Sequence, residues 1–331
     1  MRVSLSLGYS LLKYLIKNKA LARKRFPLVL MLEVTHKCNL ACEGCGRIHE
    51  YSETMREMLS VEECLKAVED CQAPVVSVTG GEPLMHPEID KIINGIIKKK
   101  KHVYLCTNGV LLGEAIKKLK PDKHLNINVH IDGLVETHDA IAGRGVFERA
   151  VEAIRKAKNA GFRVCTNTTI FKNTSEKEIR GLFSLLKELG VNGMLVSPGY
   201  SFEHNGNEIF LCQKEVREKF GFIHEISKKY KILNSPLYLK FLKGERDLKC
   251  TPWGNPTRNV LGWKSPCYLI TDNHYKTFEE CMEKTDWTRY QEGNDPRCKN
   301  CMMHCGFEPT VVLDTGKRLS DIIEMAIWSF R

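Results

Sequence analysis

The chain has 331 residues, of which 43% are hydrophobic, and it carries a formal net charge of +10 with a pI near 8.9. This length allows one large domain or a domain with an appendage, and the hydrophobic fraction can fill a sizeable core. Length and a charged fraction of 27% exclude a small disulfide-stapled scaffold, so the 14 cysteines indicate metal binding in a reducing, cytoplasmic compartment.

Residues 1–26 predict a basic amphipathic helix. Its apolar positions recur at helical spacing, namely Leu11, Leu12, Leu15 and Ile16. Lys13 and Lys17 interrupt the apolar run and no small-residue cleavage site follows, which excludes a signal peptide. Two interpretations stay open: the helix lies on the anionic inner face of a membrane, or it packs on the protein's own core. Without a zinc-finger histidine pair or an Arg-rich tract with aromatics, the charge favours a membrane over nucleic acid.

Six strands that alternate with helices are predicted over residues 27–234. The strands are expected at 26–35, 74–80, 102–109, 125–133, 162–171 and 191–199. The helices are expected at 59–72, 86–101, 110–119, 146–161 and 176–190, the first with a capping box of Ser60 and Glu63. This alternation implies a parallel sheet with right-handed crossovers. Because six units fall short of a closed barrel's eight, we expect an α/β fold, a partial (β/α)6 barrel, with an open doubly wound sheet as the alternative.

Residues 235–331 break this pattern and are rich in Pro, Gly, Asn and Trp. They predict a Cys-rich C-terminal extension with irregular backbone. The chain therefore divides into a basic segment (1–26), a partial barrel (27–234) and an extension (235–331).

A cysteine motif follows directly on the first predicted strand. Cys38, Cys42 and Cys45 have the spacing C-x3-C-x2-C, at the strand end where parallel α/β folds place their active sites. Three thiolates are one short of the set that closes a zinc site or an iron–sulfur cube. On a cube of four irons they leave one iron open to bind a substrate directly. A structural zinc with a distant fourth ligand is the alternative.

This motif resembles the cluster-binding signature of the radical S-adenosylmethionine superfamily. The segment from Thr79 to Pro83, "TGGEP", resembles the family's site for the methionine amine, which implies cofactor binding by Gly80, Gly81 and Glu82. The resemblance implies a [4Fe–4S] cluster on the three cysteines and S-adenosyl-L-methionine consumed as co-substrate. It also implies an external electron donor such as flavodoxin or ferredoxin.

Polar residues lie at the ends of the other predicted strands, where they would face the same site. They are Thr107, Asn108, His130, Asp132, Asn167 and Thr168. The resemblance implies that groups on the fourth and fifth strands bind the ribose and carboxylate of S-adenosylmethionine, for which His130 and Asn167 are the candidates. A satisfied core histidine is the alternative for His130.

A narrower resemblance covers residues 25 to about 310. The segments "RFPLVLMLEVTHKCNLACEGCG", "VHIDG", "VNGMLVSPGY" and "CTPWGNPTRNVLGWKSPCYL" together resemble the adenosyl-hopene transferase family of hopanoid biosynthesis. That resemblance implies a transferase that joins the 5′-deoxyadenosyl group to the alkene of diploptene and yields adenosylhopane. The alternative is a radical enzyme that modifies a peptide or another polyprenoid lipid.

The apolar substrate gives other residues an expected role. Addition to the alkene leaves a tertiary carbon radical, which needs a hydrogen atom. Cys106, at the end of the third strand and outside both cysteine clusters, is the candidate donor, because an S–H bond is weaker than the C–H bond it would form. A buried core thiol is the alternative. Apolar side chains are expected near the substrate entry, namely Leu11, Leu15, Trp253 and Trp263.

A second cysteine group lies in the extension. Cys298, Cys301 and Cys305 have the spacing C-x2-C-x3-C, and Cys267 and Cys250 lie upstream. Four thiolates from irregular loops can hold a zinc ion or a second cluster. We expect an auxiliary site from Cys267 and the three clustered cysteines, with Cys250 as the competing fourth ligand; thiols without a metal are the alternative.

Overall fold

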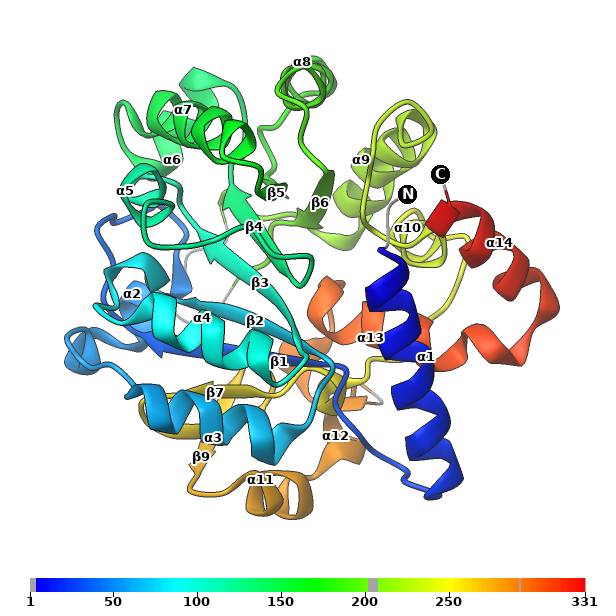
Figure 1. Cartoon of the computed structure of the whole chain (residues 1–331). Helices are drawn as coiled ribbons and strands as arrows, with labels where there is room; N and C mark the ends of the chain where they lie inside the picture. The colour runs from blue at the N-terminus through cyan, green and yellow to red at the C-terminus, as the bar shows by residue number, and fades with distance from the viewer. Residues whose placement is uncertain (1–3, 202–207, 292, 331) are drawn as a thin grey trace.

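One nine-stranded sheet forms the core, with the strand order β6-β5-β4-β3-β2-β1-β7-β8-β9 (Figure 1). The computed structural model describes residues 4–201, 208–291 and 293–330. Its strands are β1 (Val29–Thr35), β2 (Val75–Gly80), β3 (His102–Thr107), β4 (Leu125–His130), β5 (Arg163–Ile170), β6 (Gly193–Pro198), β7 (Thr257–Asn259), β8 (Gly262–Pro266) and β9 (Thr271–Tyr275). Strands β1 to β6 pair in parallel, each with the next. The predicted partial barrel is therefore confirmed.

Helices between these strands cover the outer side of the sheet (Figure 1). They are α3 (Val61–Cys71), α4 (Ile89–Lys98), α5 (Leu112–Ala115), α6 (Val135–Ala142), α7 (Val146–Asn159) and α8 (Glu176–Glu188). In α4 the buried residues recur at helical spacing, as Ile89, Ile92, Ile93 and Ile96. The predicted capping box at α3 is confirmed: Glu63 N donates to Ser60 Oγ at 3.1 Å, and Ser60 N donates to Glu63 Oε2 at 2.8 Å. Helix α6 lies outside the predicted helix ranges.

The C-terminal extension continues the sheet at the edge of β1. Strand β7 pairs in parallel with β1, with Thr257 beside Met31. Strands β8 and β9 follow in antiparallel pairing. An open edge would expose backbone N–H and C=O groups, and this pairing satisfies them. The extension is thus more regular than its composition predicted, and its boundary at residue 235 stays a prediction.

The remaining helices follow the cysteine motif, lie after β6 or surround the C-terminal strands. The α-helices among them are α2 (Gly46–Glu50), α9 (Gln213–Ile226), α10 (Pro236–Leu242), α11 (Phe278–Lys284), α12 (Trp287–Gln291), α13 (His304–Asp314) and α14 (Leu319–Phe330). The short 3-10 helices are η1 (Ser52–Thr54), η2 (Pro83–Met85), η3 (Pro252–Gly254), η4 (Pro296–Cys298) and η5 (Thr315–Lys317).

Two tryptophans of the extension belong to the core. Trp253 is 7% exposed and Trp263 is 2% exposed. Trp253 packs edge-on against Trp287, and Trp263 packs against the ring of Phe278. The expectation that they lie near a substrate entry is therefore wrong, because packing between the extension and its own helices encloses both rings.

Helix α1 (Leu5–Ala20) has one packed face and one exposed face. Leu7 is buried, and the ring of Tyr14 meets that of Phe26 at a centroid distance of 5.8 Å. Leu12 and Ile16 are 57% and 61% exposed. The interpretation that this helix packs on the protein's own core is confirmed for one face, and membrane contact by the other face stays a prediction. No helix among the described residues has the length and apolarity to cross a bilayer.

Candidate active site

The loop after β1, residues 36–45, carries the three motif cysteines and packs against the loop after β2. Gly81 N donates to Thr35 O at 2.9 Å. A Cβ on Gly80, which has φ of +135°, would lie 2.1 Å from Thr35 O, and one on Gly81 would lie 2.3 Å from Lys37 O. Both glycines are required here because the two backbones touch. We call residues 36–45 the cysteine loop.

Glu82 is fully buried and connects the loops that follow β1, β2 and β3. Its carboxylate accepts hydrogen bonds from Thr107 Oγ1 at 2.8 Å, Asn108 N at 2.8 Å and Leu84 N at 3.0 Å. Burial raises its pKa to about 7, against the opposing effect of these donors. Asn108 Nδ2 in turn donates to Asn39 Oδ1 of the cysteine loop at 2.8 Å. Glu82 thus fixes the backbone around the site and is not an acidic group open to solvent.

The three motif thiols are partly buried and electrostatically coupled. Burial, and after it the charges of Cys45 and Cys38, raises the pKa of Cys42 to about 12. Burial also raises the pKa of Cys38, although Leu40 N donates to its sulfur at 3.4 Å. Cys38 and Cys42 therefore ionise readily only with a compensating cation.

The spacing of these thiols bears on which metal group they could hold. Within residues 4–201, 208–291 and 293–330, no three potential ligands meet around one point at metal-ion distance. A single zinc ion holds its sulfurs about 2.3 Å away. A cubane distributes its thiolates over separate corners and so spaces them more widely. The donor set of three thiols in one short loop fits a cubane with one open iron.

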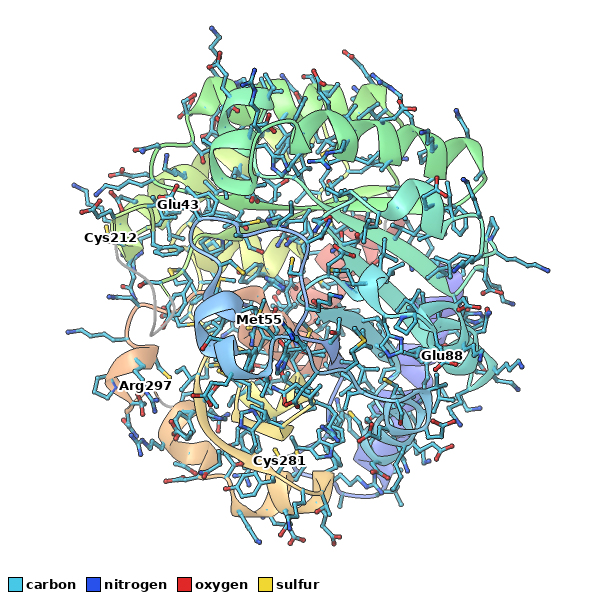
Figure 2. The ribbon with its side chains drawn as sticks, turned by 90° about the vertical axis from the view of Figure 1, so that its left-hand side faces the viewer. Glu43, Met55, Glu88, Cys212, Cys281 and Arg297 are labelled. Atoms are coloured by element: carbon cyan, nitrogen blue, oxygen red, sulfur yellow. The ribbon has the colours of Figure 1, made fainter. Side chains whose placement is uncertain are left out.

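The cysteine loop also contacts the segment that leads into α9. A Cβ on Gly44, which has φ of +75°, would lie 2.8 Å from Ile209 Cδ1 and 3.2 Å from the ring of Phe210. Figure 2 shows Glu43 of the loop and Cys212, the N-cap of α9, on the same side of the molecule. Apolar side chains thus cover the middle of the motif.

A hydrogen-bonded group lies at the ends of β4 and β5. His130 Nε2 and Asp132 Oδ2 are 2.7 Å apart, and Asn167 Nδ2 lies 3.3 Å from His130 Nδ1. Desolvation disfavours the imidazolium, but the Asp132 carboxylate outweighs this and raises the pKa of His130. Asn167 Oδ1 and Asn128 Oδ1 are buried without a hydrogen-bond partner among the described residues. Such acceptors are costly to leave unsatisfied, so they fit a polar ligand.

Cys106 lies between two polar neighbours on adjacent strands. Its sulfur is 3.3 Å from Ser77 Oγ on β2, and Asn128 Nδ2 on β4 donates to it at 3.8 Å. Burial raises the pKa of this thiol, so its S–H bond stays intact at neutral pH. The residue is therefore a positioned thiol.

Five cysteines of the extension line one cavity of about 660 Å³. They are Cys250, Cys267, Cys298, Cys301 and Cys305. A Cβ on Gly306 would lie 2.4 Å from the sulfur of Cys250, which places this thiol against α13. Burial raises the pKa of Cys301 to about 12. The structure thus brings together the four expected ligands and their competitor Cys250.

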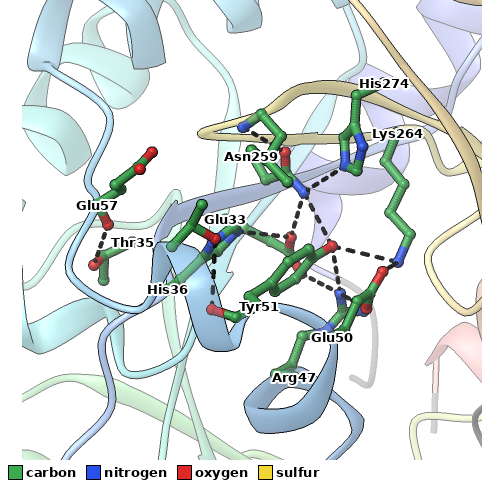
Figure 3. A network of polar contacts seen from close by, with 12 residues as sticks. Glu33, Thr35, His36, Arg47, Glu50, Tyr51, Glu57, Asn259, Lys264 and His274 are labelled. Carbon is green, nitrogen blue, oxygen red and sulfur yellow. Dashed lines mark hydrogen bonds and ion pairs between the residues drawn. The ribbon is translucent and has the colours of Figure 1, made fainter. Parts of the chain in front are cut away.

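A buried network of charges, which the sequence analysis missed, connects the two cysteine regions (Figure 3). Arg47 Nη1 lies 3.1 Å from Glu33 Oε1 and 2.9 Å from Glu50 Oε2. Lys264 Nζ lies 2.6 Å from Glu50 Oε1. Two cations and two carboxylates thus balance one another inside the protein, where an unbalanced charge would be strongly unfavourable.

Tyr268 is the point where this network meets the extension. Its carbonyl accepts from Arg47 Nη2 at 2.7 Å and from Lys264 Nζ at 3.0 Å. The Arg47 guanidinium also lies 4.1 Å from the centre of the Tyr268 ring. Because Arg47 follows Cys45 by two residues and Tyr268 follows Cys267 directly, the network fixes the two cysteine regions relative to each other.

Two sequence families match separate parts of this chain, and curated proteins resemble about half of it. The sequence pattern of the "Radical SAM superfamily" matches residues 32–186, and that of a "Domain of unknown function (DUF3463)" matches residues 194–325. The GTP 3',8-cyclase of Aliarcobacter butzleri is 33% identical over 49% of this chain and 52% of that protein. The AdoMet-dependent heme synthase of Methanosarcina barkeri is 34% identical over 51% of this chain and 50% of that protein. The chain thus spans about half the length of these curated relatives.

A solved structure shares the fold. Streptococcus suis SuiB bound to S-adenosylmethionine superposes with a TM-score of 0.65 at 16% identity, over 86% of this chain and 70% of SuiB. SuiB has also been solved with its precursor peptide SuiA. At this identity the likeness concerns the fold: a mostly parallel α/β sheet of the kind found in radical S-adenosylmethionine enzymes.

The contact between the two loops predicts the effect of a Gly81→Ala substitution. The added Cβ would overlap the backbone of the cysteine loop at 2.3 Å, so we expect this variant to lose most of its capacity to hold iron after anaerobic reconstitution. The control is Gly221→Ala in α9, where no atom lies within 4 Å and alanine is the better helix former. Normal iron content in Gly81→Ala would contradict the requirement for this contact.

The charge network predicts a large cost for Lys264→Met. Removal of the ammonium leaves buried carboxylate charge uncompensated, so we expect the free energy of unfolding in urea to fall by about 3–5 kcal/mol. Lys284→Met is the matched control, because Lys284 pairs with Glu280 at 2.7 Å on the exposed surface. That variant should lose much less stability, because solvent screens the exposed pair. Equal losses in the two variants would refute the stabilising role of the network.

Proposed function

We propose that this chain, whose residues 32–186 form a domain of the radical S-adenosylmethionine superfamily, is an enzyme that adds the 5′-deoxyadenosyl group to the alkene of diploptene. The product is adenosylhopane. The proposal rests on the sequence resemblance over residues 25 to about 310 and on one structural observation, the placement of the Cys106 thiol. The curated relatives share the radical domain, and each covers about half of this chain.

The superfamily uses a [4Fe–4S] cluster and S-adenosylmethionine, and residues of this chain fit both. Cys38, Cys42 and Cys45 would hold the cluster. When bound and reduced by an external donor, the cluster would cleave S-adenosylmethionine and supply the 5′-deoxyadenosyl radical. Asn167 and His130 offer polar atoms for the cofactor at the ends of β5 and β4, and Asn167 Oδ1 lacks a partner among the described residues.

The protein's own chemical contribution is the hydrogen atom that completes the adduct. Addition of the adenosyl radical to the terminal alkene carbon leaves an unpaired electron on the tertiary carbon. Transfer of hydrogen from Cys106 forms a C–H bond, breaks the S–H bond and leaves a sulfur radical. One electron from the external reductant and one proton from solvent then restore the thiol. The raised pKa of Cys106 supports this role, because only the protonated thiol can donate.

The hydrocarbon substrate suggests where the enzyme works. Diploptene dissolves in lipid and not in water. Helix α1 keeps Leu12 and Ile16 exposed, and Lys13 and Lys17 are exposed beside them. A peripheral contact with an anionic membrane would therefore bring the enzyme to its substrate.

A peptide substrate is the second candidate. It is favoured by the shared fold with SuiB, which has been solved with a precursor peptide. Both candidates share the radical chemistry and differ in the acceptor. A covalent adenosyl adduct separates them, because the alkene retains the nucleoside, whereas abstraction of a hydrogen atom from a peptide releases 5′-deoxyadenosine.

The cavity of the extension supports an auxiliary iron–sulfur cluster at Cys267, Cys298, Cys301 and Cys305. It has a volume of about 660 Å³, and no single metal-ion point is formed there among the described residues. A cavity of this size has room for a cluster, and zinc is the alternative. Cys250, on the same cavity, remains the competing ligand.

The donor role predicts a split phenotype for Cys106→Ala. With the reconstituted enzyme, reductant and diploptene, we expect S-adenosylmethionine cleavage to continue while adenosylhopane falls by two orders of magnitude or more, roughly the effect of losing a reacting group. Cys64→Ala is the control, because Cys64 is a fully buried thiol on α3. Unchanged adenosylhopane from Cys106→Ala, measured by mass spectrometry of lipid extracts, would refute the assignment.

The auxiliary site predicts that iron survives the loss of the first cluster. A variant with Cys38, Cys42 and Cys45 changed to Ala should retain about four irons per chain after reconstitution. The matched variant, with Cys267, Cys298 and Cys301 changed to Ala, should also retain about four, held by the cysteine loop. An iron-free first variant would rule out a second cluster, and zinc found there by elemental analysis would support the other metal.

A further inference from the structure

Large hydrophobic side chains that are strongly exposed are concentrated on the two terminal helices. Among the described residues there are twelve, and ten of them lie on α14, on α1 or at the C-cap of α1. Those of α1 and its C-cap are Leu5, Tyr9, Leu12, Ile16 and Leu21. Those of α14 are Leu319, Ile322, Ile323, Ile327 and Phe330. We call these ten side chains the terminal face.

Helix α14 directs polar groups toward the protein. Asp321 is 4% exposed, and its carboxylate lies 2.6 Å from the guanidinium of Arg246. Glu324 lies 2.7 Å from the ammonium of Lys240 on α10. A helix on the surface of a globular protein normally shows the opposite arrangement, with its apolar stripe toward the core. Here two ion pairs and the partly buried Met325 hold α14 in place, and five large apolar side chains remain exposed.

Helix α1 also makes polar contacts with the protein, beside its buried Leu7 and the contact between the Tyr14 and Phe26 rings. Ser6 Oγ lies 3.5 Å from His124 Nε2, and Ser10 Oγ lies 3.2 Å from His102 Nε2. These hydroxyls bind the body of the protein, while Tyr9 on the same helix is 68% exposed. Both helices therefore combine polar and apolar contacts with the protein, and both leave several large apolar side chains exposed.

The two helices lie on the same side of the molecule, with α1 in blue and α14 in red (Figure 1). Lys19, near the end of α1, reaches the turn before α14: its Nζ lies 3.8 Å from the position of a Cβ on Gly316. The two helices that carry the terminal face are thus neighbours on this side of the molecule.

The charge around this face identifies its partner. Residues 1–32 contain seven Lys and Arg residues and neither Asp nor Glu. Lys317 and Arg318 precede α14. A second copy of the chain would bring two such basic surfaces together and be repelled. An anionic bilayer matches both the charge and the apolarity of this surface. Its headgroups attract the cations, and its acyl region accepts the apolar side chains.

We propose that α1 and α14 together form a docking face for anionic lipid bilayers. This inference deepens the membrane contact of the proposed function by adding the C-terminal helix, and it does not depend on the identity of the substrate. The face binds at the interface and does not span the bilayer. Its bipartite construction means that neither helix alone provides the full affinity.

Sedimentation with vesicles tests the face on the full-length, reconstituted protein. The probes are vesicles of phosphatidylcholine with and without phosphatidylglycerol. We expect binding to the anionic vesicles, weakened by salt, and a loss of roughly tenfold or more in affinity for Leu12→Ser/Ile16→Ser and for Ile323→Ser/Ile327→Ser. The control is Val135→Ser/Leu261→Ser, which removes the two strongly exposed hydrophobics outside the face and should leave binding intact.

Three results would overturn the proposal. They are wild-type protein that stays in solution, an Ile323→Ser/Ile327→Ser variant that binds as tightly as wild type, and a dimer in solution that these substitutions dissociate. Circular dichroism and substrate-independent cleavage of S-adenosylmethionine should match wild type in every variant, since the changed side chains are exposed. Vesicle binding without any adenosylhopane would refute the proposed substrate and leave the docking face standing.

Discussion

The backbone contact between the cysteine loop and the loop after β2 is the constraint on which the site depends. Gly81 N donates to Thr35 O at 2.9 Å, and Glu82 N donates to Lys37 O at 2.8 Å. No side chain fits between these backbones, so Gly80 and Gly81 are dictated by sterics. The same contact brings the buried carboxylate of Glu82 to the end of β3, where it holds the backbone N–H of the next strand end. One contact thus sets the positions of three loops.

Much of this architecture follows from local sequence. The apolar runs predicted all six parallel strands, and the spacing of Cys38, Cys42 and Cys45 after the first of them predicted the location of the site. The role of Glu82 was not foreseen, because the sequence gives an acidic residue near a turn without telling whether it is buried. The network of Arg47 could not be predicted for a different reason. Its hydrogen bond to the Tyr268 carbonyl joins residues 221 positions apart, which local sequence patterns do not relate.

The termini illustrate a second limit of pattern analysis. Helical spacing shows that α14 has an apolar side, but only tertiary contacts tell which side packs. The ion pair of Asp321 with Arg246 reverses the usual arrangement. The same principle explains the extension, whose irregular composition concealed three strands, because β7 forms on the edge that β1 supplies. In both cases distant partners decided the local structure.

The central claim is that the cysteine loop holds a cluster whose fourth iron binds S-adenosylmethionine. Pulsed electron paramagnetic resonance of the reduced, reconstituted protein tests it most directly, with the cofactor labelled with ¹⁵N at its amino group. The account predicts a hyperfine coupling from the labelled nitrogen, which disappears when Cys42 is replaced by Ala. A reduced-cluster spectrum that is identical with and without S-adenosylmethionine would contradict it.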